Sequence, residues 1–184
     1  MARYERIYKD WFFHRLPKGV TFADYEAGPG KKDRVLTAEL VERMRRELPK
    51  TMSRVFDIKR VPRGAEALQL LDVLWTPGIA DALMQRSDPD DENNEFKLTL
   101  SELAVFTGDV VLEALGGAWH YARMPNFFES VIRVSGFEML VFQTVMKKGS
   151  DDFGHETLTS KCDVFRKMVA SRRGTDGQDD VDAN

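Results

Sequence analysis

The sequence predicts an α+β fold in which helices pack on a small antiparallel sheet. Between Thr99 and Leu115, apolar residues recur at steps of three and four, which is the spacing of an amphipathic helix. After Gly116 and Gly117 the apolar period changes to two, and a Ser-Gly dipeptide then separates two β-prone runs. These observations predict a helix followed by a three-stranded meander over about 118–142, with its first strand over 118–124 and its last over 137–142.

The chain before this stretch is expected to be helical. Residues 2–16 form a short helix with an aromatic stripe, which either packs on the domain or docks a partner. A capping threonine, Thr37, begins a helix that runs through Leu48 with charged residues on its outer side. The segment 52–58 is ambiguous between strand and helix, whereas 65–75 and 79–86 read as helices, the second after a Thr-Pro start signal.

The segment 87–95 is the one conspicuous charge block of the sequence, with five carboxylates and no basic residue. The spacing of an EF-hand calcium loop is absent. A solvated, mobile loop is one interpretation, and an acidic patch that attracts a basic protein surface is the other. The candidate partner-binding residues are therefore Asp88, Asp90, Asp91, Glu92 and Glu95.

The central helix is expected over about 100–115. Thr99 and Glu102 stand at the spacing of a capping box, which marks a helix start, and the paired glycines mark its end. After the meander we expect a short helix near 144–148 and an amphipathic helix over 157–169. Its apolar face includes Cys162, for which a buried structural thiol is favoured over a reactive one.

Length and composition predict one α+β domain over 1–170 and a disordered tail over 171–184. Within the domain, a helical part spans about 1–98 and a helix-meander-helix part about 99–170. The formal net charge of −3 lacks the basic excess typical of nucleic-acid binding. The single cysteine, the absent secretory signal and the lack of a long apolar run indicate a cytoplasmic protein without a membrane span.

Recognised catalytic and cofactor motifs are absent from the sequence. No phosphate-binding loop, metal-ligand spacing or nucleophile elbow occurs, so no cofactor, metal or catalytic residue is predicted. The hypothesis of a hydrolase-type enzyme requires an unrecognised site that involves His120, Glu129 or Asp109. An oligomeric adaptor that uses the aromatic N-terminal helix is a separate hypothesis.

Residues 112–148 carry a resemblance. The end of a helix, Gly116-Gly117-Ala118-Trp119, a strand, a hairpin with Gly136, and Val141-Phe142 followed by Val145-x-Lys147 resemble the C-terminal part of small uncharacterised bacterial proteins. Some of these look like immunity proteins of interbacterial toxin systems. The resemblance supports the predicted fold more than a function. Together with the small size, the absent catalytic motifs and the acidic segment 87–95, it favours a non-catalytic protein-binding module, an immunity protein that neutralises a cognate toxin. The acidic segment makes a basic toxin domain the candidate partner. The resemblance carries no functional residue across.

Overall fold

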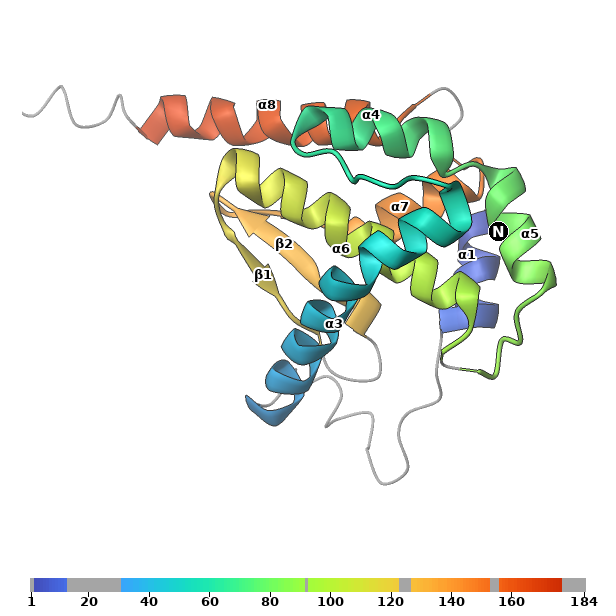
Figure 1. Ribbon diagram of the computed structural model, residues 1–184. Helices are drawn as coiled ribbons and strands as arrows, with labels where there is room; N and C mark the ends of the chain where they lie inside the picture. The colour runs from blue at the N-terminus through green and yellow to red at the C-terminus, as the bar shows by residue number, and fades with distance from the viewer. Residues whose placement is uncertain (1, 13–30, 92, 123–126, 153–155, 177–184) are drawn as a thin grey trace, which may run out of the picture.

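The computed structural model describes residues 2–12, 31–91, 93–122, 127–152 and 156–176. It shows a helical body with one small antiparallel sheet, so the predicted α+β class is confirmed (Figure 1). Helix α6 (Glu95–Leu115) lies at the centre and packs against α3 (Lys31–Phe56), α4 (Ala65–Leu74), α5 (Pro77–Gln85) and α7 (Val141–Gly149). The α4 and α5 segments agree with the sequence prediction.

Helix α6 begins one turn earlier than the sequence suggested. The side chain of Asn94 caps it by accepting the backbone N–H of Lys97 at 2.8 Å. The predicted capping box at Thr99 and Glu102 is therefore wrong, because both residues are buried inside the helix. The proposed division of the chain near 98 also falls within α6. Buried residues surround most of the helix axis, which is typical of a central helix.

The sheet consists of β1 (Ala118–His120), β2 (Val131–Val134) and β3 (Phe137–Met139), paired antiparallel in that order. Ser135 and Gly136 both have positive φ and make the predicted tight hairpin turn. A Cβ on Gly117 would lie 2.2 Å from the carbonyl oxygen of Arg133, so only glycine permits this close approach.

The meander is shorter than predicted at both of its outer strands. The first was expected to reach 124, but β1 ends at 120, and residues 123–126 lie outside the described residues. The last was expected to reach Phe142, but helix α7 begins at Val141. Val141 and Phe142 are buried together with Val145 and Met146. Their four-residue spacing fits one face of a helix better than the alternation of a strand.

Helix α3 is longer than predicted in both directions. Thr37 does not begin it; this buried residue lies inside the helix and its hydroxyl donates to the carbonyl oxygen of Ala122 at 2.9 Å. The helix continues through Pro49 to Phe56, which settles the ambiguous segment as helical to that point. Burial explains its length, since one apolar stripe faces α6 on both sides of the proline: Val41, Met44, Leu48 and Met52.

The aromatic residues of the N-terminal segment pack on the body of the protein, as the first of the two interpretations expected. Helix α1 (Arg3–Ile7) is followed by a π-helical turn, η1 (Tyr8–Phe12). Tyr8 meets Phe128 at a centroid distance of 5.2 Å, and Trp11 meets Phe96 at 5.0 Å. Both are edge-on contacts of the kind that stabilise cores. The rest of the predicted helix, 13–16, lies outside the described residues.

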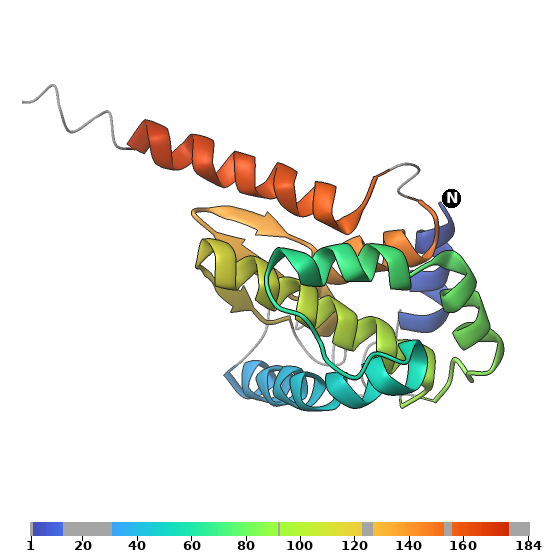
Figure 2. The ribbon, with the colours of Figure 1, turned by 45° about the horizontal axis from the view of Figure 1, so that its top comes forward.

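The last helix, α8 (Leu158–Asp176), extends beyond the predicted start of the tail at 171. It runs along one side of the body beside the hairpin (Figure 2). Arg173 explains the extension, because it donates to the carbonyl oxygen of Leu115 at 2.8 Å and to Oγ of Ser135 at 3.0 Å. These tertiary contacts keep the polar segment from residue 171 on helical, although its sequence has no apolar period. Residues 177–184 lie outside the described residues.

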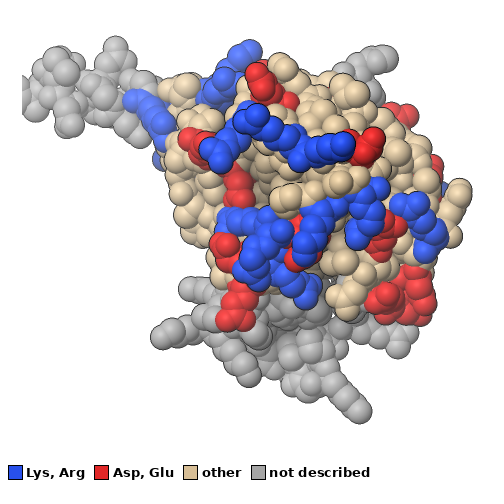
Figure 3. Space-filling model, in the orientation of Figure 1, with Lys and Arg blue, Asp and Glu red and all other residues tan. Residues whose placement is uncertain are grey.

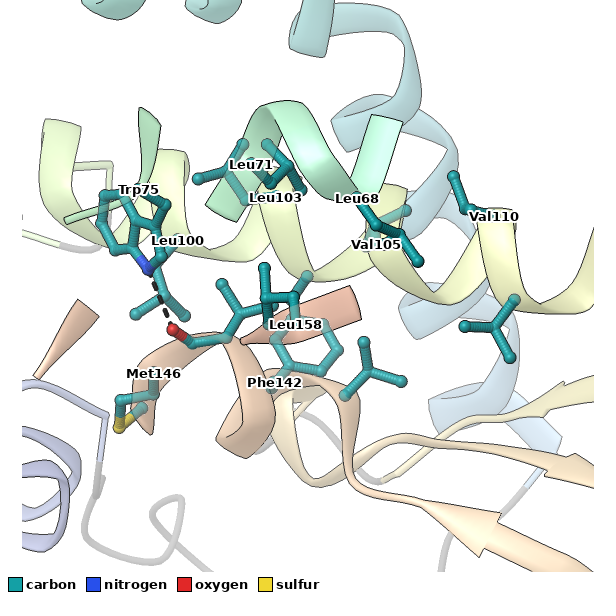
Figure 4. Packing of buried hydrophobic residues seen from close by; sticks show 14 of the residues in the cluster. Leu68, Leu71, Trp75, Leu100, Leu103, Val105, Val110, Phe142, Met146 and Leu158 are labelled. Atoms are coloured by element: carbon teal, nitrogen blue, oxygen red, sulfur yellow. Dashed lines mark hydrogen bonds between the residues drawn. The ribbon is translucent and has the colours of Figure 1, made fainter. Parts of the chain in front are cut away.

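Two glycines allow tryptophans to reach the core. The indole N–H of Trp75 donates to the carbonyl oxygen of Val145 at 2.9 Å, and a Cβ on Gly149 would lie 2.6 Å from that nitrogen (Figure 4). A Cβ on Gly108 of α6 would lie 2.3 Å from the ring of Trp119. One hydrophobic cluster includes residues from α1 through α8.

Candidate functional site

The loop between α5 and α6 is exposed, as predicted, and its backbone is held by hydrogen bonds. Asp88 accepts the backbone N–H of Asp90, and Asp91 accepts that of Asn93, both at 2.9 Å. The amide of Asn94 donates to the carbonyl oxygens of Asp88 and Asp91 at 2.8 and 2.6 Å. The three aspartates therefore occupy defined positions at the surface.

The five predicted residues of this loop separate into different groups. Asp88, Asp90 and Asp91 are exposed and make no ion pair within the described ranges. We call these three the acidic loop. Glu95 differs, because it lies in the first turn of α6 and accepts Arg54 at 3.1 Å and Arg86 at 2.7 Å. Glu92 lies outside the described residues.

A groove between α3 and α6 begins where the acidic loop ends, and the sequence interpretation did not include it. It encloses about 240 Å³. Two aliphatic side chains, those of Met44 and Leu98, line it together with polar and charged ones, and Asn93 connects it to the loop. The other lining residues are Arg43, Glu47, Lys50, Thr51, Arg54 and Glu102.

Basic side chains gather around this groove. Residues 43–63 contain eight Lys or Arg against two acidic residues, whereas the whole chain has a formal net charge of −3. Figure 3 shows the blue side chains in two bands, one over α3 and one over the connection from α3 to α4, with a red group towards one end of the same face. A charge count over the whole chain hides this local excess, but a count over this segment would have found it.

Some of the basic side chains are neutralised by neighbours. Arg45 makes a two-pronged contact with Asp109, both N–O distances being 2.7 Å, and a further contact with Glu42. The hydrogen bond to Asp109 is the main reason that the pKa of Arg45 is raised. Lys50 pairs with Glu47 at 2.8 Å, and Arg54 pairs with Glu95 as described above. Within the parts of the chain that are described, the remaining exposed basic residues of the segment make no ion pair. These are Arg43, Arg46, Lys59, Arg60 and Arg63.

Glu102 lies at the base of the groove and is only 4% exposed. Its Oε2 has no hydrogen-bond partner among the described residues. Burial raises the pKa of this carboxyl, and a hydrogen bond with Thr51 opposes the increase. The groove therefore has a buried acid beneath a rim of exposed cations.

The outer face of the sheet carries a second hollow, of about 510 Å³. It brings together two of the three residues of the enzyme hypothesis, His120 and Glu129, whose carboxylate also accepts the hydroxyl of Tyr8 at 2.9 Å. The carboxylate of the third residue, Asp109, has other partners. It accepts the indole N–H of Trp119 at 3.0 Å and forms the bidentate contact with Arg45.

Metal-binding and thiol chemistry receive no positive support from the described residues. No three His, Cys, Asp or Glu side chains within them are grouped so that they would hold a metal ion. The prediction that Cys162 is buried is confirmed, and burial raises the pKa of its thiol to about 12. The nucleophilic thiolate is therefore a minor species at neutral pH.

Comparisons with known proteins were made with family models, with curated proteins and with solved structures, and the chain matched none of them. Among the residues that the structure describes, no helix combines the length and the apolar character that a membrane crossing requires.

Proposed function

We propose that the protein is a binding module that recognises another protein through the acidic loop. The observation that carries this proposal is a set of three exposed aspartates in a hydrogen-bonded loop, which make no ion pair with any residue that the structure describes. Like charges gathered at one place accelerate encounter with an oppositely charged surface. A loop that is already ordered loses less conformational entropy on binding than a disordered one.

More specifically, we propose that the protein is a cytoplasmic immunity protein that neutralises a cognate toxin, and that the toxin carries a basic surface. The local resemblance over residues 112–148 supports this assignment, and the acidic loop supplies the chemistry for recognising such a surface. Binding would block the toxin sterically, which requires a stable complex and no reaction at the interface. Oligomeric adaptor function remains a separate hypothesis, and light scattering would test it.

The test is co-expression with toxin domains encoded beside the gene, followed by growth measurement and isolation of the complex. The informative variant is D88N/D90N/D91N, because asparagine retains the oxygen that accepts the loop N–H groups and removes the charge. We expect the association rate with the toxin to fall by about tenfold at low ionic strength, with little change in dissociation.

A matched control is E39Q/E66Q/E113Q, which removes three exposed carboxylates elsewhere on the surface. It should leave the association rate within about twofold of the original value, because those charges lie outside the loop. Failure of every candidate toxin to form a complex or to be neutralised would refute the proposal. An equal loss in the two variants would refute the assignment to the acidic loop.

A hydrolase is the second candidate, favoured by the shared hollow of His120 and Glu129. An imidazole and a carboxylate at one cavity are groups that can activate water. Hydrolysis of generic ester and phosphoester substrates would be compared between the original protein and H120A. Turnover that disappears in H120A supports this function, and absence of turnover in the original protein rejects it for these substrates.

A further inference from the structure

The exposed cations beside the groove follow two lines on one face of the protein. Along α3, residues 43, 46, 50 and 54 recur at steps of three and four, so they lie on one side of the helix and extend for about 16 Å at about 1.5 Å per residue. The second line is the connection to α4, which carries Lys59, Arg60 and Arg63 and crosses the same side of the body (Figures 1 and 3). We call the two lines together the basic face.

The basic face has charge available for a ligand. Five of its side chains are exposed and make no ion pair within the described residues, as shown above. Like charges that share one face raise one another's electrostatic energy, and a ligand with several carboxylates or phosphates would lower it. The exposed guanidinium groups suit such ligands because each presents donors in a planar fork.

The groove indicates which kind of anion fits. Its lining includes the aliphatic side chains of Met44 and Leu98, which suit an aliphatic side chain of a peptide. It also includes the carboxylates Glu47 and Glu102, and it leads by way of Asn93 to the acidic loop. A uniformly charged polyanion following the groove would meet these carboxylates, and like-charge contacts are costly. A peptide, by contrast, can carry carboxylates at the positions that face the cations and uncharged residues at the others.

We infer that the basic face and the groove bind an extended acidic peptide segment with aliphatic residues between its carboxylates. The segment belongs to the same protein partner as the surface that contacts the acidic loop, and this part of the inference rests on the proposed function. The partner would thus present a basic surface and an acidic segment to adjoining regions of one face. Such paired complementarity fixes the orientation of a complex and rejects partners that match only one region.

The test uses fluorescence anisotropy with a labelled peptide of alternating Glu and Leu and the full chain. A peptide of equal length with Gln in place of Glu is the uncharged control, and single-stranded DNA of equal charge represents the alternative class. We expect binding of the acidic peptide that weakens by at least about tenfold between about 50 mM and about 500 mM NaCl, since salt screens exposed charges. The Gln peptide and the DNA should bind more weakly.

The variant R43Q/R46Q/R60Q removes three exposed cations and should weaken peptide binding by about tenfold, since each lost surface contact costs about two- to threefold. R6Q/K148Q/K167Q removes three cations that lie outside the basic face and should change it by less than about twofold. Melting temperatures of both variants verify folding.

Three outcomes overturn the inference: absence of peptide binding at low salt, tighter binding of DNA than of peptide, or equal loss in the two variants. These outcomes are distinguishable from failure of the proposed function, which the D88N/D90N/D91N variant tests with the toxin. Peptide binding at the basic face without any toxin complex would support the site and reject the partner assignment. A toxin complex that depends on the acidic loop but not on the basic face would support the proposed function and reject the assignment of the acidic segment to that partner.

Discussion

The acidic loop and the basic face adjoin each other, yet their charges are organised differently. In the loop, the aspartates lie in consecutive turns, and the hydrogen bonds of these turns join residues two positions apart in the sequence. The basic face assembles its charges from one side of a helix and a connection, and a tertiary contact between Arg45 and Asp109 anchors that helix to α6. The loop is a local feature, whereas the basic face exists only when α3 is docked. Disturbing the docking should therefore affect the basic face first.

The largest effect is expected for Gly108→Ala. The new Cβ would lie 2.3 Å from the ring of Trp119, which also donates to Asp109, so the ring and its partners must shift. We expect a loss of about 3 kcal/mol in the free energy of unfolding, measured by urea denaturation. Gly78→Ala is the matched control, because its Cβ has only one atom nearby, at 3.9 Å. That change should be neutral or stabilising by up to about 0.5 kcal/mol.

Asn94→Ala should affect the acidic loop most. It removes the cap of α6 and both hydrogen bonds to loop carbonyl groups, so we expect a loss of about 2 kcal/mol. Thr99→Val is the comparison, since its buried hydroxyl has no partner among the described residues. Losing that hydroxyl should cost less than about 0.5 kcal/mol. A larger cost for Thr99→Val than for Asn94→Ala would restore the capping box at Thr99.

Glu102→Gln should stabilise the protein at neutral pH by about 1 kcal/mol, because a charge is no longer buried beneath the groove. Burial raises the pKa of Glu102 in the folded state, so its protonated form favours folding. That contribution is complete below the unfolded-state pKa and is lost as pH rises through the folded-state pKa. The difference between the two proteins should thus shrink towards about pH 4. Denaturation midpoints across pH measure it, and a pH-independent difference would contradict this account.

The smallest effect concerns Arg54, whose contact with Glu95 connects the basic face to the first turn of α6. Its side chain is 58% exposed, so the coupling energy should be about 0.5 kcal/mol or less and should decline with added salt. A double-mutant cycle of Arg54→Gln and Glu95→Gln measures it. A coupling several times larger would show that the two regions stabilise each other.

Elements with a strong local signal were predicted well. The hairpin at Ser135-Gly136, the helix at 65–74 and the Pro77 helix start depend on turn chemistry and on apolar spacing within a few residues. Element ends were predicted less well, because distant partners decide them. Helix α8 continues past 171 through the contacts of Arg173, and α3 continues past Pro49 because its apolar stripe faces α6.

The candidate site shows the same division. A charge block in consecutive residues is visible in sequence, so the acidic loop was predicted together with its exposure. The groove was missed because its lining comes from two helices about fifty residues apart and from the end of the loop. Glu102 was misinterpreted as a cap residue, since spacing alone does not reveal that a carboxyl group is buried.

By itself, the sequence determined the α+β class, the hairpin, the central helix and the clustering of acidic residues in one loop. Each of these follows from interactions between near neighbours, which a linear pattern records directly. Tertiary structure alone decided where helices end, which cations make no ion pair among the described residues and that a groove opens beside the acidic loop. Those properties depend on side chains that meet only after the chain has packed, because burial and charge pairing are set by neighbours in space.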